Sequence, residues 1–567
     1  MGWRASGWRM ASSGTSELTH PTQLRGRTPP WGAVGWFVLA SLVLAALALR
    51  LSGLAAEGFA DDEVHKWLAA ARYLTGDFGG DDVEHPMLMK SLVALSLAAF
   101  RGALAPETIT RLPSAAAGAL TVLAGAFLGR RLFGRAAGLM AAGLLALAPT
   151  AVGYQRIAKE DTLLGLFFTL CLWCLAEARA AAEDGRAREQ RRFEAWSAAF
   201  LGAAFASKYF VFYFLIPLLC YAWLERVSAW RVPLRRWATL VLLALAVFLV
   251  LNWAPLLPGT ADYMVRYIRG DAVGGDRGVS ESILFMGKLY GNLALRGDAT
   301  PWWFFGAFAA LKFAPVTALL GFGGLALALV RRAPAHRVVL PWLAVFLAFS
   351  LIAGGKYGRF FVSAMPAFLL LAAHAAAELA RGAAAGLAAW RGASLAPTRR
   401  WATAAVAVAL IAPEAEAAVT HAPHDRLYLS PLAGGDRNVT WFLPHCDYFD
   451  AGVREAVQWV AANAEPGAEV ASEVDWTVRL YAERAGRTDL ASSPVLAGRA
   501  CHSGRPCYVL VQAGRLYRHN EVAVARLQAR DPAFVARIRG TDAVRVYRLA
   551  PGEPLFPSDA QPTVRRP

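Results

Sequence analysis

The stretch ADDEVHKWLAAARYLTGDF, residues 60–78, follows the first long apolar segment of the chain and opens on Asp61, Asp62 and Glu63. A group of carboxylates beside a membrane span is costly unless the carboxylates are paired or used in function. Two further acidic motifs, DDVEHP and KED, also lie beside apolar segments. Acidic groups that recur at one edge of a membrane domain indicate an active site at that edge.

The composition is that of a membrane protein. The chain has 567 residues, of which 56% are hydrophobic and 18% charged, whereas soluble domains average about 25% charged residues. The mean hydropathy is +0.37 and the pI about 9.9. A net charge of +16 would suggest nucleic acid in a soluble protein, but here the arginines fall in short loops between apolar segments, as membrane topology requires. We therefore expect membrane lipids, and no nucleic acid, as partners.

Eleven apolar segments predict about 11 transmembrane helices within residues 31–419, although several are shorter than the roughly 20 residues of a full span. They lie at 31–54, 111–129, 136–154, 161–178, 195–207, 209–225, 238–257, 301–330, 338–353, 360–380 and 401–419. Arginines cluster before the first segment and after every second one, which makes those loops cytoplasmic. The other loops, and everything after residue 420, then face outward. Residues 1–30 are polar and proline-rich, and we expect a disordered cytoplasmic N-terminus.

Segment 86–101 decides the path of the first external loop, 55–110. It is apolar enough to cross, but as a helix it spans only about 24 Å and it contains Lys90. A crossing would also invert the arginine pattern. We interpret it as an interfacial helix along the outer leaflet, like 63–75, whose apolar residues share one helical face. An ordinary span is the alternative.

Residues 420–567 follow a different pattern. Residues 451–474 predict a helix, a Pro-Gly turn and a strand. Residues 507–512 and 543–549 predict buried strands, with a helix over 516–530 between them. Strands that alternate with helices indicate a small α/β domain, which we expect to be extracytoplasmic.

The six cysteines show no CxxC spacing and so do not indicate a zinc site. Three of them lie in apolar runs and are expected to be small core residues, namely Cys171, Cys174 and Cys220. The other three lie in the polar C-terminal part, where one disulfide can form, namely Cys446, Cys501 and Cys507.

Three carboxylates are candidates for catalysis. Asp62 and Glu63 suit a general base or a group that positions an acceptor. Alternatively Asp61 or Asp62 caps the helix that follows, where the helix dipole favours acids. Asp161, in RIAKEDTLLGLFF, is either a second carboxylate converging on the first or a cap on the next helix, with Lys159 reaching towards head groups.

Glu84 and His85 precede Pro86, which suits the first turn of a helix. They either face the same cleft as the acids, where a divalent metal can bind, or belong to a solvated loop. Two adjacent residues do not make a coordination sphere, so no cofactor is certain.

Three cations near the outer edge are candidates for binding a phosphate. Lys208 lies between two short apolar runs, and a lysine there needs an anion or a wet cavity. Lys356 and Arg359 lie in GGKYGRFF. For each of them, anchoring to lipid head groups is the alternative.

Together these motifs resemble a known family. FADDEVHKW followed by VEHPMLMKSL is similar to the first external loop of the protein O-mannosyltransferases. The chain is similar, more loosely, to the bacterial aminoarabinose transferases of the same superfamily. RIAKEDTLLGLFF, ASKYFVFY and GRFFVSAMPAFLLLAA follow in the family order. The resemblance covers residues 50–380, and DYFDAGVREAVQWV continues it weakly into the outer domain.

The resemblance implies a C-type glycosyltransferase fold and a sugar donor linked to polyprenyl phosphate. It places the catalytic carboxylate at Asp62, with Glu63 beside it, and a second acidic position at Asp161. His85 matches the histidine of a His-Pro string, although Met87 stands where a second proline is usual. The large lumenal β-trefoil insert of the mannosyltransferases is missing, which puts a protein Ser/Thr acceptor in doubt.

The function expected from this resemblance is sugar transfer from the lipid-linked donor to a protein, lipid or glycan acceptor. Asp62 would act as base in an inverting single displacement, and cations would stabilise the leaving phosphate. If the acceptor is itself a phosphate, Asp62 only orients it. The Ala- and Arg-rich composition is compatible with the inner membrane of a high-GC bacterium. A flippase or transporter of lipid-linked sugar, and a scaffold without catalysis, are the alternatives.

Overall fold

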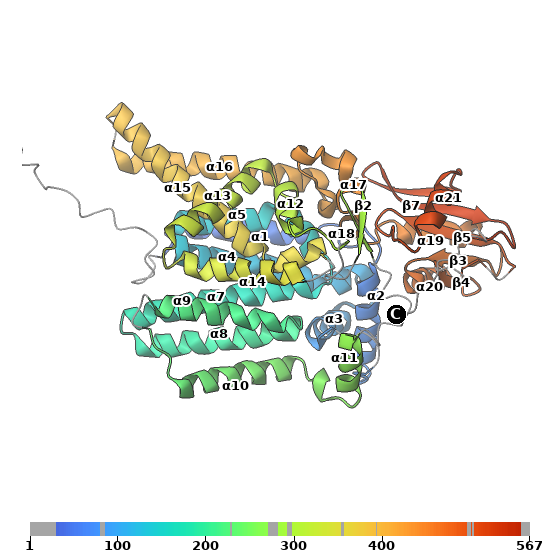
Figure 1. The fold of residues 1–567 in the computed structure, drawn as a ribbon, viewed down its shortest axis with the longest axis horizontal. Helices are drawn as coiled ribbons and strands as arrows, with labels where there is room; N and C mark the ends of the chain where they lie inside the picture. The colour runs from blue at the N-terminus through green and yellow to red at the C-terminus, as the bar shows by residue number, and fades with distance from the viewer. Residues whose placement is uncertain are drawn as a thin grey trace, which may run out of the picture.

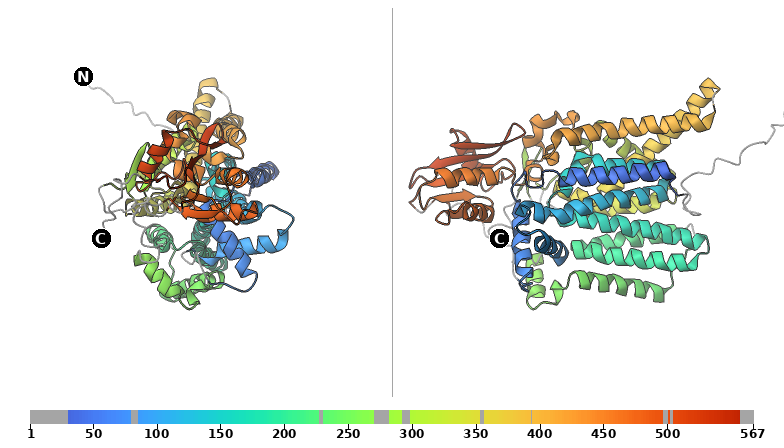
Figure 2. Two further views of the ribbon diagram at one scale, coloured as in Figure 1. Left: turned by 90° about the vertical axis from the view of Figure 1, so that its right-hand side faces the viewer. Right: turned by 180° about the vertical axis from the view of Figure 1, so that it is seen from behind.

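The computed structural model describes residues 30–79, 85–226, 230–269, 282–291, 298–352, 356–392, 394–495, 500–501 and 504–556. Long helices run side by side in one bundle, and a smaller domain with a sheet projects from one end of it (Figure 1). The views in Figure 2 show that this domain covers the bundle end near α2. The fold is therefore mainly helical, with a small C-terminal α/β domain, as the sequence predicted.

Six of the described helices are long and apolar enough to cross a membrane. They are α1 (Ala33–Leu51), α4 (Pro106–Phe133), α7 (Glu160–Glu183), α10 (Leu234–Leu251), α15 (Met365–Arg391) and α16 (Leu395–His421). The number rises to eight if each of two bent pairs counts as one span. These pairs are α5 (Arg135–Leu147) with α6 (Pro149–Gln155), and α13 (Pro315–Arg331) with α14 (His336–Ile352). The protein is thus an integral membrane protein, while the expected number of 11 spans stays a prediction.

Shorter helices complete the bundle. They are α8 (Ala187–Ser207), α9 (Leu215–Glu225) and α12 (Phe304–Leu311), with the short 3-10 helices η1 (Val211–Phe214), η2 (Ala254–Leu256) and η3 (Gly358–Ser363). Small residues allow close packing between the helices. A Cβ at Gly138 on α5, for example, would lie 2.7 Å from the carbonyl oxygen of Ala126 on α4.

Three helices lie across or beside one end of the bundle. This is the end from which the small domain projects. The three helices are α2 (Asp61–Tyr73), α3 (Met87–Phe100) and α11 (Thr260–Arg269). In Figure 1 the bundle helices run horizontally, whereas α2 is upright and α3 is seen end-on. Both α2 and α3 therefore lie roughly perpendicular to the spans, which is the orientation an interfacial helix would have.

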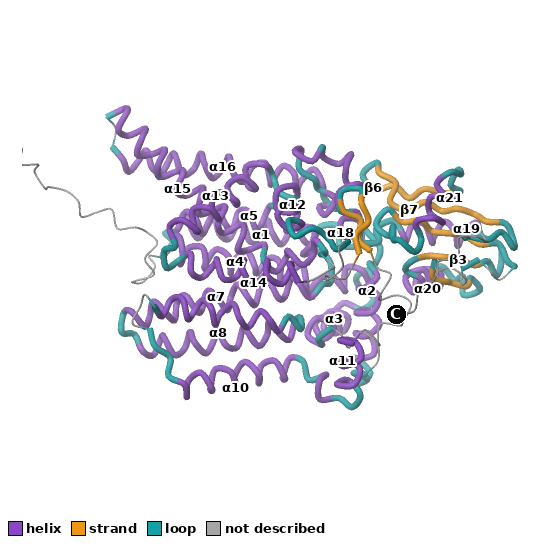
Figure 3. Tube along the Cα trace, viewed as in Figure 1, coloured by secondary structure: helices purple, strands orange, loops and turns teal. Residues whose placement is uncertain are grey.

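The C-terminal domain, residues 453–549, is called the outer domain because it projects from one end of the bundle, with its strands in orange in Figure 3. It is built on a five-stranded sheet of order β4-β3-β5-β7-β6. Its elements are α19 (Val453–Asn463), β3 (Glu469–Ser472), α20 (Asp475–Arg484), β4 (Ala491–Pro494), β5 (Cys507–Gln512), α21 (Glu521–Gln528), β6 (Phe534–Ile538) and β7 (Thr541–Leu549). Strand β3 pairs in parallel with β4 and β5, while β7 pairs antiparallel with β5 and β6. Strand β5 has the predicted bounds, β7 begins two residues earlier than predicted, and α21 is shorter than the predicted helix.

The connection between bundle and outer domain consists of single turns and short helices. They are η4 (Asp425–Leu427), η5 (Pro431–Ala433), η6 (Gly435–Asn438), α17 (Val439–Phe442) and α18 (Pro444–Tyr448). A two-stranded ribbon, β1 (Ser282–Phe285) and β2 (Lys288–Gly291), was not expected and pairs antiparallel. Its turn donates from Met286 N to the Phe442 carbonyl at 3.0 Å.

One disulfide forms in the outer domain, between Cys501 and Cys507. Cys446, the third candidate, is free and buried in α18. Cys171, Cys174 and Cys220 are also free and buried.

Candidate functional site

The acidic triplet forms the first turn of α2, at the end of the bundle that the outer domain covers (Figure 1). Negative charge in the first turn stabilises a helix through its dipole. The N-cap residue is Ala60, so neither Asp61 nor Asp62 is the cap that one interpretation of the sequence proposed. Instead Glu63 accepts a hydrogen bond from Ala60 N at 3.0 Å.

Glu63 is fully buried and its carboxylate is saturated by donors. Arg111 on α4 donates to it from Nε at 2.9 Å and from a terminal nitrogen at 2.6 Å, and Ala158 N donates at 2.9 Å. The same guanidinium also donates to the carbonyl of Leu54 at 2.6 Å. With every lone pair engaged, Glu63 is suited to fixing the loop before α2. Its contacts favour a positioning role over the catalytic role suggested by the sequence.

Asp62 faces the charged groups of the neighbouring helices. Its side chain is 27% exposed and forms an ion pair with Lys159, which immediately precedes α7. Burial by itself would raise the pKa of the Asp62 carboxyl, but Lys159, Arg359 and Lys66 outweigh it and hold that pKa well below its usual range. Asp62 is therefore ionised at neutral pH. Lys159 is buried, so it does not reach lipid head groups.

Two further ion pairs flank this one. Lys66, one turn along α2 from Asp62, contacts Glu160 at 2.8 Å, and both side chains are buried. Lys208, directly after α8, donates to Asp161 at 2.6 Å. Asp161 is buried, and the described residues leave its second oxygen without a hydrogen-bond partner. Each carboxylate of this cluster is thus paired with one lysine.

Arg359 on η3 differs from the three lysines of the site, because no carboxylate of the described residues forms an ion pair with it. Its guanidinium lies over the rings of Tyr357 at 4.4 Å and Phe449 at 5.6 Å. Burial lowers the pKa of Arg359, but the field of Asp62 and other nearby groups, Asp161 among them, raises it above its usual value. Arg359 therefore stays charged next to both catalytic candidates.

Glycines allow η3 to approach the other helices. A Cβ at Gly358 would lie 2.8 Å from the Tyr154 hydroxyl oxygen, and a Cβ at Gly165 on α7 would lie 3.3 Å from the Val362 carbonyl oxygen. Real Cβ atoms rarely come this close, so these two small residues bring Arg359 into the cluster.

The described residues of the cluster carry a net positive charge. Four cations stand against three carboxylates, namely Lys66, Lys159, Lys208 and Arg359 against Asp62, Glu160 and Asp161. A ligand with a single negative charge would make the site neutral. The surplus belongs to the guanidinium, which matches phosphate oxygens with its fork of donors.

Of the pair expected at the next loop, Glu84 lies outside the described residues. His85 is described, and its carbonyl accepts a hydrogen bond from Lys90 at 3.0 Å. The charge of His85, when present, acts on Asp62, so it belongs to the same site. In the described part of the chain no three side chains of His, Cys, Asp or Glu gather as metal ligands, and the proposed metal site stays a prediction.

Lys356 is bound elsewhere. Its ammonium donates to the Thr300 carbonyl at 2.9 Å and is buried, which lowers its pKa. Among the three cations predicted to bind phosphate, Arg359 is therefore the one best placed, Lys208 is held by Asp161, and Lys356 contributes to the fold of the loop.

A cavity of about 10 Å³ lies in the middle of the cluster, lined by Lys159, Asp161, Arg359, Cys446 and Phe449 among others. This is about the space that one water molecule needs. Asp161 and Lys159, the partner of Asp62, thus line one cavity. A sugar can enter this cavity only if the cavity walls separate.

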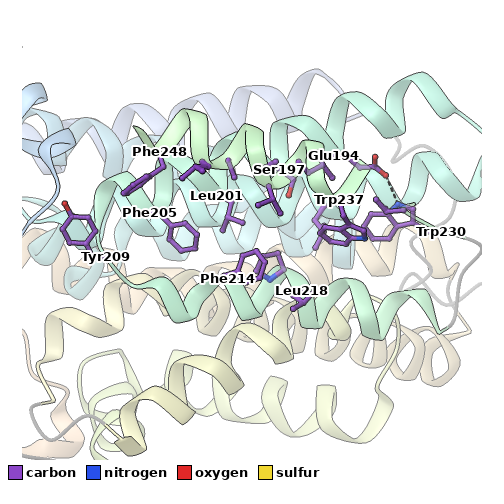
Figure 4. Close-up of a pocket in the computed structure, with 18 residues that line it drawn as sticks. Glu194, Ser197, Leu201, Phe205, Tyr209, Phe214, Leu218, Trp230, Trp237 and Phe248 are labelled. Carbon is purple, nitrogen blue, oxygen red and sulfur yellow. Dashed lines mark hydrogen bonds between the residues drawn. The ribbon is translucent and has the colours of Figure 1, made fainter. Parts of the chain in front are cut away.

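A larger groove of about 310 Å³ begins beside the site (Figure 4). Its walls come from α8, α9 and α10 and are almost entirely apolar. Tyr209, the residue after Lys208, and Phe248 lie at the end near the site, and Trp230 lies at the other end. Asn252 connects this end to α3, since it receives a bond from Met87 N at 2.9 Å and donates to the Tyr209 hydroxyl at 3.1 Å.

Sequence reasoning missed most of the partners in these pairs. Lys66 and Glu160 adjoin the candidate residues without being predicted as site residues, and the apolar pattern places Arg111 at the start of a span. A buried pair of Lys312 and Asp447, 2.9 Å apart, was also missed. A charged residue inside a long apolar segment was the one available signal for Arg111 and Lys312.

Comparison with known proteins gives the same picture of the fold. The family model described as dolichyl-phosphate-mannose-protein mannosyltransferase matches residues 84–253. A search of curated protein sequences returned no match.

Solved structures match over most of the chain at low sequence identity. ArnT from Cupriavidus metallidurans in the apo state is 14% identical with a TM-score of 0.51, covering 91% of this chain and 98% of that one. The oligosaccharyltransferase of Archaeoglobus fulgidus in the apo form is 12% identical with a TM-score of 0.51, covering 81% of this chain and 64% of that one. Residues 84–253 of this chain thus resemble the protein mannosyltransferases, and the chain as a whole shares the fold of the C-type membrane glycosyltransferase ArnT.

Proposed function

We propose that this protein transfers a sugar from a polyprenyl-phosphate carrier to an acceptor on the extracytoplasmic face of a bacterial inner membrane. The observation that carries the proposal is Arg359, a guanidinium without a carboxylate of its own in a cluster where each carboxylate has a lysine. A sugar linked through phosphate to a polyprenol has one negative charge. It would therefore bring the cluster to neutrality.

The same charge balance favours the reaction. When the bond between the anomeric carbon and the phosphate oxygen breaks, the carrier phosphate gains a second negative charge. Arg359 and Lys208 would stabilise that charge in the transition state more than in the bound donor, which is the requirement for catalysis.

The apolar groove is suited to the carrier's hydrocarbon tail. Glu194 and Phe205 line it from positions eleven residues apart on α8, or about 16 Å along the helix. That is roughly half the thickness of the hydrocarbon core. A tail in this groove would bring its phosphate to the end near Tyr209, next to Lys208. The Archaeoglobus fulgidus oligosaccharyltransferase AglB, which has a similar fold (12% identity, TM-score 0.50), has a structure in complex with a dolichol-phosphate.

Asp62 would be the base of an inverting single displacement. The acceptor hydroxyl attacks the anomeric carbon opposite the phosphate, and its proton passes to the carboxylate as the new bond forms. Because the pKa of Asp62 is held low, it accepts the proton only late, when the attacking oxygen already carries positive charge. The class of acceptor, whether protein, lipid or glycan, is not part of the proposal.

The test is donor consumption by the purified protein in detergent, with radiolabelled polyprenyl-phosphate sugars and extracted envelope glycans as acceptors. We expect Asp62→Asn to lose transfer by at least about a hundredfold, the low end of what a general base contributes. Asp184→Asn, which changes a surface carboxylate at the opposite end of the bundle, is the matched control and should keep wild-type activity. A flippase cannot act without two compartments, so wild-type protein that moves the donor across vesicle membranes but never consumes it in detergent would overturn the proposal.

A further inference from the structure

The outer domain holds the loop that leads into the catalytic helix α2. Arg454 donates to the carbonyls of Ala55 at 2.8 Å and Ala56 at 2.7 Å. The Tyr481 hydroxyl accepts from Phe59 N at 2.6 Å. Backbone groups of three residues before α2 are therefore satisfied by side chains that lie about 400 positions later in the chain. Figure 1 shows α2 between the bundle and this domain.

The strongest of these contacts is centred on Asp61. Its backbone N–H donates to Asp450 at 3.0 Å, and its carboxylate accepts from the Trp476 indole. Arg515 binds Asp450 through two nitrogens at 2.8 and 2.7 Å, and one of these nitrogens lies 3.5 Å from Asp61. Two carboxylates thus share one guanidinium, directly beside Asp62.

Asp450 belongs to a turn that also reaches the cavity. Phe449 has φ of 45° and Asp450 has φ of 65°, a left-handed conformation that is costly for residues other than glycine. Phe449 lines the cavity together with Arg359 and Asp161. One strained turn therefore forms a wall of the site and holds the start of the catalytic helix. This turn lies in DYFDAGVREAVQWV, the motif that no other part of the site explains.

We propose that the outer domain is a working part of the active site, and that Arg515 is a positioning residue for Asp62. This inference rests on the proposed function. Arg515 keeps Asp61 and Asp450 together although both are acidic and Asp450 is buried. Without the guanidinium the two carboxylates would repel each other, and the first turn of α2 would move away from the turn at Asp450. Asp62 would then lose its alignment with the acceptor, while the donor contacts of Arg359 and Lys208 would remain.

The variant to test is Arg515→Met, which keeps the length of the side chain and removes its charge. We expect kcat to fall on the order of ten- to a hundredfold, the cost of a small misplacement of a catalytic group. KM for the donor should change less than about threefold, because the groove and Arg359 are untouched. Arg548→Met is the matched control, since Arg548 pairs with Glu465 at the surface of the same domain.

A second substitution separates positioning from general destabilisation. Adding Asp61→Asn to Arg515→Met removes one of the two repelling charges and keeps an oxygen for the Trp476 indole, so it should restore most of the lost kcat. Hydrogen exchange gives a readout that needs no activity. In Arg515→Met, amides of residues 55–66 should exchange faster than in wild type, while those of α4 and α7 keep their rates. If Arg515→Met does not fold, Trp476→Phe removes one contact to Asp61 without exposing a charge, and should give a smaller change in the same direction.

The outcomes of these experiments are distinct. Wild-type kcat together with unchanged exchange at residues 55–66 in Arg515→Met would overturn the inference and leave the proposed function standing. A fall in kcat that Asp61→Asn does not restore would also overturn it. If wild-type protein consumes no donor, the proposed function fails, and faster exchange at 55–66 alone would then show that Arg515 holds α2.

Discussion

Replacing Lys159 by methionine should move the pH dependence of transfer towards higher pH. Lys159 is the cation in contact with Asp62. Among the neighbouring cations it lowers the Asp62 pKa the most. Two unit charges 4 Å apart attract by about 4 kcal/mol at an effective dielectric constant of 20, which is about 3 pKa units. Arg359 and Lys66 remain in the variant. We therefore expect the Asp62 pKa to rise by about 1–3 units, the usual effect of one neighbouring charge.

The sign of this shift follows from the proposed role of Asp62 as base. The carboxylate must be ionised to accept a proton, so activity is lost as pH falls through its pKa. In wild type that pKa is held low and the acid limb lies below the usual range of aspartate, which is about 4. In Lys159→Met the acid limb should lie about 1–3 pH units higher. A group with a depressed pKa also stabilises the fold above its unfolded pKa, so the variant should lose some stability at neutral pH as well.

The assay is kcat at saturating donor in detergent over a pH range that extends from neutral pH to below the usual pKa of aspartate, about 4, because kcat reports ionisation in the complex and a weaker donor affinity does not disturb it. Lys159→Arg keeps the charge and should keep the wild-type limb. If Lys159→Met and wild type share one acid limb while both are active, either Asp62 is not the group that ionises or Lys159 does not set its pKa. Either result refutes the reasoning.

Two further predictions concern neighbouring groups. Arg359→Gln should raise KM for a polyprenyl-phosphate sugar and lower kcat. We expect kcat/KM to fall by at least about tenfold, because a charged hydrogen bond contributes about 1.5–3 kcal/mol. Equal kcat/KM for Arg359→Gln and wild type would rule out this phosphate contact. Glu63→Gln should destabilise the protein by about 3–5 kcal/mol, since it leaves Arg111 as a buried unpaired charge. A thermal melt in detergent checks this, with Asp184→Asn as the surface control that should change stability by less than about 1 kcal/mol.

The elements of the outer domain could be predicted because their signals are local. Strand β5 is a continuous apolar run and has the bounds that the sequence suggested. The ribbon of β1 and β2 could not be predicted in the same way. Its turn places Met286 at φ 51° and Gly287 at φ 75°, and methionine is not a residue typical of such a turn. Contacts with α17, more than 150 residues later, hold it in place.

The sequence could predict that these charged residues gather at one edge, but it could not predict how they pair. The positions of Asp62, Asp161 and Arg359 follow from the motifs and the topology, which assign them to one edge of the membrane. Which cation meets which carboxylate depends on how α2, α7 and η3 pack, and no local pattern encodes that. For this reason the sequence leaves open that Lys159 faces lipid head groups, whereas the structure makes it the partner of Asp62.

The packing also explains why three acids stand in a row. Successive residues of a helix point about 100° apart, so three neighbours at the start of α2 face three different parts of the protein. Asp61 meets the outer domain at Asp450 and Arg515, and Glu63 meets Arg111 on α4. Asp62, between them, pairs with Lys159, which lines the cavity. The two outer acids hold the helix from opposite sides, which orients the middle one. The structural roles of Asp61 and Glu63 are therefore compatible with the proposed role of Asp62, because a base must be held in a fixed direction towards the acceptor.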